Sequence, residues 1–183
     1  MDNYRFLLSG SGGQGVITMA ILLAEAAAIH EGLVAVQSQS YGPEARGGAT
    51  RSDVIISDTE IYFPKVLQPN VLVALTNEAS AKYLPLIRPG GLCLYDSDLV
   101  RPSKRIDATL KGLPLFQAVK DTFGKTQTFN ICVLGALVTL TGAVRVDSLR
   151  KVLEGRFAPA FHQANNKALE LGADLARPFV DAQ

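Results

Sequence analysis

A glycine-rich segment near the N-terminus places the strongest constraint on the fold of this 183-residue chain. Residues 9–15 read Ser-Gly-Ser-Gly-Gly-Gln-Gly, after the apolar run 6–8 and before a helix-like stretch from residue 16 to about 29. This order predicts a strand, a tight turn and a helix. Glycines let the backbone approach an anion closely, and the unpaired amides that start the helix point toward that anion. The segment is typical of a phosphate-binding turn, and the alternative is a tight turn that binds no ligand.

Three of these glycines, Gly10, Gly12 and Gly15, match the spacing G-x-G-x-x-G of dinucleotide-binding turns. Enzymes that bind a nicotinamide or flavin cofactor there carry an acidic residue about 20 positions further on, at the end of the second strand. The second apolar run, 33–36, is followed instead by Gln37-Ser38-Gln39-Ser40. The missing acid favours another phosphate-bearing ligand, or none, and leaves a stand-alone NADP- or flavin-binding protein as an alternative.

Charged residues are scarce in this chain, at 19% against about 25% in an average globular domain. Because the centres of protein interfaces are depleted in charge, the shortage predicts that a partner covers part of the surface. The net charge of +1 gives no electrostatic reason to bind nucleic acid or an anionic membrane.

The cysteines and the apolar runs predict a cytoplasmic protein. Cys93 and Cys132 are the only cysteines, and each lies inside an apolar run, which is typical of buried free thiols. The first residues lack the layout of a secretion signal. The longest apolar run, 131–144, is too short to cross a bilayer.

Apolar runs bounded by turn residues alternate with helical patterns along the chain. This order predicts a three-layer α/β/α fold with a Rossmann-like, largely parallel sheet and C-terminal helices, with residues 1–183 forming one domain. Asp147 or Ser148 is expected to cap the helix that begins nearby. Strands are expected at 6–8, 33–37, 54–56, 71–75, 92–95 and, near an edge, 106–110, and helices at 16–29, 80–87, 115–123, 130–141, 147–154 and 159–175.

A second unusual segment, residues 40–52, reads Ser-Tyr-Gly-Pro-Glu-Ala-Arg-Gly-Gly-Ala-Thr-Arg-Ser. It follows the second predicted strand, and ligands of open α/β sheets gather at the carboxyl ends of the strands. Both loops are therefore expected to face one crevice, where Arg46 suits a bidentate contact with phosphate or carboxylate. The alternative is a solvated loop in which Glu44 pairs with Arg46, a contact worth little energy.

Together, the two loops resemble those of a known family. Residues 10–16 (Gly-Ser-Gly-Gly-Gln-Gly-Val), 40–49 and 51–57 (Arg-Ser-Asp-Val-Ile-Ile-Ser) are similar to the gamma subunit of the 2-oxoacid:ferredoxin oxidoreductases. The sequences of these segments are most similar to those of the 2-oxoglutarate (2-ketoglutarate) branch. The similarity covers nearly the whole chain, because it continues at 62–66 (Tyr-Phe-Pro-Lys-Val), 69–73, 77–79 and 165–169.

The resemblance implies an enzyme that converts 2-oxoglutarate, coenzyme A and oxidised ferredoxin to succinyl-CoA, CO2 and reduced ferredoxin. In that family the chemistry uses thiamine diphosphate, Mg²⁺ and iron–sulfur clusters. This chain carries two cysteines, whereas a cluster is held by four, and His30 and His162 lack metal-ligand spacing. No residue is therefore assigned a catalytic or metal-binding role, and the isolated chain is expected to be inactive. The partners implied are alpha and beta subunits that bind thiamine diphosphate, a ferredoxin-like subunit, and ferredoxin.

The resemblance also implies that this subunit contributes to coenzyme A binding and to assembly. Gln14 is expected to add a side-chain amide donor to the glycine turn, whereas Glu44 and Arg46 would line the route to the active site or contact a partner. Alternatives are a subunit for pyruvate, branched-chain 2-oxoacids or indolepyruvate, and a structural interface protein whose turn binds no ligand. The residues assigned to the cofactor are Gly10, Gly12, Gly13, Gln14, Gly15, Glu44 and Arg46.

Overall fold

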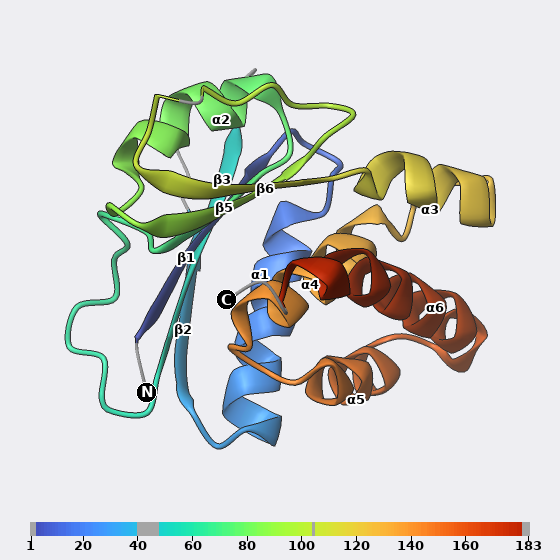
Figure 1. Ribbon diagram of the computed structural model, residues 1–183. Coiled ribbons are helices and arrows are strands. Elements are labelled where there is room, and N and C mark those ends of the chain that lie inside the picture. The colour runs from blue at the N-terminus through green and yellow to red at the C-terminus, as the bar shows by residue number, and fades with distance from the viewer. Residues whose placement is uncertain (1–2, 40–47, 104, 181–183) are drawn as a thin grey trace.

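A computed structural model describes residues 3–39, 48–103 and 105–180 of the chain. Its centre is a six-stranded sheet of order β2-β3-β1-β4-β5-β6 with helices on both faces (Figure 1). The strands are β1 (Tyr4–Gly10), β2 (Val34–Gln39), β3 (Thr50–Ser57), β4 (Val71–Ala74), β5 (Gly91–Asp96) and β6 (Ala108–Leu113). The α-helices are α1 (Val16–Glu25), α2 (Asn77–Tyr83), α3 (Leu115–Phe123), α4 (Phe129–Thr141), α5 (Val146–Arg156) and α6 (Pro159–Ala176).

The predicted α/β fold is confirmed, and β6 lies at an edge as expected. The sheet is largely parallel, because β1 pairs in parallel with β4, β4 with β5, and β5 with β6. Only β3 runs in the opposite direction, antiparallel to both β1 and β2. Antiparallel neighbours need no helical crossover between them, which agrees with the absence of a helical pattern from the sequence between β2 and β3.

Two helices differ from their predicted bounds. The first ends as an α-helix at Glu25 and continues as a π-helical turn over Ala26–His30. The helix expected from residue 80 begins earlier, at Asn77, because the hydroxyl of Thr76 accepts a hydrogen bond from the amide of Ala79 at 3.1 Å. A short 3₁₀ turn, Leu84–Leu86, then extends it.

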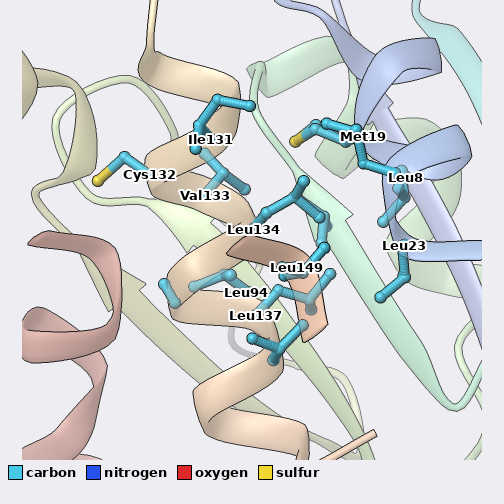
Figure 2. Close-up of a cluster of buried hydrophobic side chains, with 14 of the residues drawn as sticks. Leu8, Met19, Leu23, Leu94, Ile131, Cys132, Val133, Leu134, Leu137 and Leu149 are labelled. Atoms are coloured by element: carbon cyan, nitrogen blue, oxygen red, sulfur yellow. The ribbon is translucent and has the colours of Figure 1, made fainter. Parts of the chain in front are cut away.

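The main core lies between the sheet and α1, α3, α4, α5 and α6. Nine of the thirteen residues of α4 are buried, so this apolar helix is the centre of the core. Figure 2 shows Leu134 and Leu137 of α4 on the side that faces Leu8 and Leu23. On its other side α4 packs closely on α6, since a Cβ added at Gly172 would lie 1.8 Å from the carbonyl oxygen of Cys132.

A smaller core occupies the other face of the sheet, under α2 and the 3₁₀ turn that follows it. Cys93 belongs to this core and Cys132 to the main one, and both are free and buried, as predicted. Burial raises the pKa of each thiol to about 12. No helix among the described residues has the length and apolar character needed to span a membrane.

Candidate functional site at the glycine loop

The glycine loop, residues 10–15, joins the end of β1 to the start of α1, as the sequence predicts. Gly13 and Gly15 have φ angles of +88° and +72°, a region that side-chain-bearing residues rarely adopt. Glycine at position 10 leaves room for the side chain of Gln14, because a Cβ there would lie 2.4 Å from Oε1 of Gln14. Gly12 differs: its φ is not positive, and a Cβ added there would meet no atom within 4 Å. The fold itself therefore does not require glycine at position 12.

The side chain of Gln14 holds the glycine loop in place. Its Oε1 accepts a hydrogen bond from the amide of Ser11 at 2.7 Å, and its Nε2 donates to the carbonyl of Leu75 at 3.3 Å, just beyond the end of β4. This intramolecular role was not predicted from the sequence. An amide nitrogen carries two hydrogens, so one donor of Gln14 remains for the ligand contact expected above.

The N-terminus of α1 follows the loop directly. Gly15 is the N-cap residue, no described side chain caps the helix, and its first turn contains no acidic residue. The first intrahelical bond runs from the amide of Met19 to the carbonyl of Gly15 at 2.9 Å. The amides of the first turn therefore point out of the helix at its positive end, an arrangement that favours an anion.

Two hollows lie beside the glycine loop. One, of about 260 Å³, lies over the first turn of α1 and reaches Thr50. The other, of about 250 Å³, lies between the loop and the starts of α3 and α4, where Phe116, Gln127 and Asn130 contribute to the lining. Among the described residues, neither lining contains a carboxylate. A negatively charged ligand would therefore meet amides and neutral side chains here.

The start of α4 is a part of this site that sequence reasoning missed. Asn130 packs against the loop so closely that a Cβ on Gly15 would lie 2.5 Å from its Nδ2. The N-cap residue Thr128 makes no capping hydrogen bond, and its hydroxyl is buried without a hydrogen-bond partner among the described residues. A second helix N-terminus thus joins that of α1 beside the loop. The signal in the sequence was the pair of polar residues Thr128 and Asn130 at the start of an apolar helix whose first turn has no acidic residue.

The described end of the second predicted loop lies beside the first. Thr50 lies opposite Gly10 in the ladder between β1 and β3, and its hydroxyl donates to the carbonyl of Gly10 at 2.9 Å. The hydroxyl of Ser9 donates in turn to the carbonyl of Thr50 at 2.7 Å. Glu44 and Arg46 lie outside the described residues, so their proposed roles remain predictions.

The remaining charged residue of that segment, Arg51, has a structural role on the sheet. Its guanidinium donates twice to the carboxylate of Asp53, with both distances 2.8 Å. The hydrogen bonds that Arg51 donates to this carboxylate raise the pKa of the guanidinium. Neither His30 nor His162 belongs to a metal site, since the described residues contain no group of three or more His, Cys, Asp or Glu side chains placed to hold a metal.

Comparison with known proteins relates this arrangement to one family. The model of the family described as "Pyruvate ferredoxin/flavodoxin oxidoreductase" matches residues 5–175. The 2-oxoglutarate synthase subunit KorC of Methanocaldococcus jannaschii is 41% identical over 172 residues, which are 93% of this chain and 92% of that protein. The gamma subunit of a keto/oxoacid ferredoxin oxidoreductase from Geobacter sulfurreducens superposes with a TM-score of 0.86 at 42% identity, covering 94% of this chain and 98% of that one.

A more distant structure shares the fold. It is a 2-oxoglutarate:ferredoxin oxidoreductase from Magnetococcus marinus with 2-oxoglutarate, coenzyme A and succinyl-CoA bound. The superposition has a TM-score of 0.87 at 24% identity and covers 97% of this chain but 32% of that longer one. The fold of the present chain thus also occurs as one part of a larger polypeptide.

Proposed function

Because the chain belongs to the pyruvate ferredoxin/flavodoxin oxidoreductase family, we propose that it is the gamma subunit of a 2-oxoglutarate:ferredoxin oxidoreductase and that its glycine loop binds coenzyme A. The observation that supports coenzyme A binding is the N-terminus of α1. No described side chain caps it, and it lies beside two hollows whose described lining residues include no carboxylate. The 41% identity to a 2-oxoglutarate synthase subunit supports the choice of substrate.

In this proposal the pyrophosphate of coenzyme A lies against the glycine loop. The amides of Gly12, Gly13 and the first turn of α1 would donate to its oxygens, and the positive end of the helix would stabilise its charge. Gly12 supports a close approach, because a Cβ added there would meet no atom of the described residues within 4 Å. Asn130 and the second amide hydrogen of Gln14 are further donors beside the same hollow. Bound coenzyme A supplies the thiol that accepts the acyl group.

The redox chemistry is assigned to partner subunits. Four cysteines hold an iron–sulfur cluster, whereas this chain has two, which lie in separate cores as buried thiols. Alpha and beta subunits would bind thiamine diphosphate and Mg²⁺, and a ferredoxin-like subunit would carry electrons to ferredoxin. This chain would hold and orient coenzyme A and help the complex assemble.

The test is an activity measurement on the complex purified without oxygen through a tag on this chain. We expect reduction of a viologen dye that depends on both 2-oxoglutarate and coenzyme A. Pyruvate, a branched-chain 2-oxoacid and indolepyruvate, each assayed separately, should give lower kcat/KM values. A higher kcat/KM with one of these 2-oxoacids would make it the substrate in place of 2-oxoglutarate. A tagged chain that purifies alone and without activity would contradict the proposed function.

A further inference from the structure

The connection between β3 and β4 lies at the edge of the sheet opposite the glycine loop (Figure 1). It presents large apolar side chains to solvent. Tyr62, Phe63 and Leu67 are 88%, 53% and 67% exposed. Apolar side chains gathered on one exposed segment are typical of interaction sites. The glycine loop follows the carboxyl end of β1, whereas this connection leads into the amino end of β4, so the two surfaces do not overlap.

The connection is held in a defined position. Val66, in its middle, is only 1% exposed, and its carbonyl accepts a hydrogen bond from the guanidinium of Arg51 at 2.5 Å. At its end, the side chain of Asn70 accepts from the amide of Arg5 at 2.8 Å and donates to the carbonyl of Asn3 at 2.9 Å. The buried anchor at Val66 therefore fixes the exposed residues on either side of it.

Basic side chains surround the same apolar group. A hollow of about 500 Å³ at the amino ends of β1 and β4 is lined by Arg5, Lys65 and Arg88 together with Phe63 and Leu67, and no acidic residue of the described part of the chain contributes to the lining. None of the three cations is paired with a carboxylate among the described residues. The combination of positive charge and apolar area is complementary to a segment that carries both carboxylates and apolar side chains.

We propose that this basic–apolar surface, formed by Arg5, Tyr62, Phe63, Lys65, Leu67 and Arg88, docks an acidic and apolar segment of another subunit of the complex. The inference rests on the assembly part of the proposed function and not on coenzyme A binding. A protein fits better than a small ligand, because Tyr62 is highly exposed and lies outside the lining of the hollow, with its hydroxyl donating to the carboxylate of Glu60 at 2.8 Å. Aromatic residues and arginine are enriched in the energetically important centres of protein interfaces.

Crosslinking in the assembled complex tests the position of the partner. With a photoreactive benzophenone amino acid at position 62, illumination should join this chain to a different subunit, at a peptide with Asp or Glu within a few residues of the linked atom. A crosslink to a second copy of this chain, a crosslink to a segment without acidic residues, or no crosslink would each overturn the proposal.

Charge reversal tests the contribution of the basic residues. The double variant Lys65→Glu/Arg88→Glu should weaken the affinity of this chain for the rest of the complex at least about tenfold, and more strongly at low salt. Lys65→Glu alone has its matched charge control in Lys120→Glu, at an exposed lysine on α3. For the apolar part, Leu67→Ser should weaken assembly, whereas Ile29→Ser, at a side chain 66% exposed, should not.

These outcomes separate the docking surface from the proposed function. Equal affinities of the double variant and Lys120→Glu would overturn the docking proposal while leaving a complex that still purifies with this chain. The variants should also leave the KM for coenzyme A of the assembled fraction unchanged, because they lie at the opposite edge of the sheet. A changed KM for coenzyme A together with full assembly would show that these residues act on coenzyme A binding and not on docking, and would overturn the docking proposal.

Discussion

Four helices of this protein, α1, α3, α4 and α5, begin in two different ways. α5 and α3 each have a carboxylate from elsewhere in the chain at their N-terminus: Glu31 accepts from the amide of Arg145 at 3.0 Å, and Asp96 accepts from the amide of Phe116 at 2.7 Å. α1 and α4 have neither a capping side chain nor an acidic residue in the first turn, and both begin beside the glycine loop. At α5 and α3 the chain supplies the anion itself, whereas at α1 and α4, beside the glycine loop, no described side chain does so and the amides are available to a ligand.

The two carboxylates also differ in their surroundings. Asp96 is fully buried, and burial raises its pKa although three backbone amides donate to it. Glu31 is partly exposed; burial raises its pKa, but hydrogen bonds from Ser148 and Arg145 outweigh that effect and lower it. Both carboxylates stabilise a helix N-terminus by attraction between a negative charge and the positive end of the helix. We assign the same attraction to the pyrophosphate of coenzyme A at α1.

The largest effect is expected at the buried carboxylate. Asp96→Ala leaves the amides of Asp98, Leu99 and Phe116 without an acceptor, and should lower the free energy of unfolding by about 3 kcal/mol. Urea unfolding of the purified chain measures this. Asp96→Asn retains one acceptor oxygen and should lose less. Equal stabilities of the two variants would show that Asp96 does not stabilise the fold by accepting hydrogen bonds from these amides.

The second effect is expected at Glu31 and depends on pH. Glu31→Gln should cost about 1 kcal/mol at neutral pH, because the charged acceptor at the start of α5 is lost. The pKa of Glu31 is lower in the folded protein than its ordinary value of 4.5, so its contribution is present above that pH and is lost as the pH falls. The difference in unfolding free energy between wild type and variant should therefore shrink below about pH 4.5. A difference that stays constant with pH would contradict this assignment.

The smallest effect compares two threonines. Thr76→Val should cost about 1 kcal/mol of stability, because the hydroxyl caps α2 through the amide of Ala79. Thr128→Val, at the start of α4, should change stability by less than about 0.5 kcal/mol, because its hydroxyl has no hydrogen-bond partner among the described residues. Thermal unfolding of the two variants side by side measures the contrast. A larger loss for Thr128→Val would show that α4 is capped after all.

The sequence predicted the elements of the fold but not all of their ends or directions. Apolar runs and turn residues were sufficient to find the strands and helices, because each buries one face or both. They carry no information on strand direction, so the reversal of β3 was not anticipated. The prediction that Asp147 or Ser148 caps α5 was wrong: Arg145 is the N-cap residue, and the acceptor is Glu31, far away in sequence.

The candidate site was predicted only in part, because sequence patterns report local features and not contacts between distant segments. The glycine loop is local in sequence, so its spacing and the following helix were sufficient to find it. The bond from Gln14 to Leu75 and the packing of Asn130 on Gly15 depend on which segments the fold brings together. Neither a motif nor a periodic pattern contains that information.

The most direct test of the account is the KM for coenzyme A of the assembled complex with Gly12→Asp. A Cβ at position 12 would meet no atom of the described residues within 4 Å, and the position has no positive φ, so the fold should not change. Repulsion of the pyrophosphate should raise the KM at least about tenfold, or about 1.4 kcal/mol. Gly155→Asp is the matched control, since Gly155 on α5 has equally open space and no positive φ. A KM for Gly12→Asp equal to that of the control would contradict coenzyme A binding at the glycine loop.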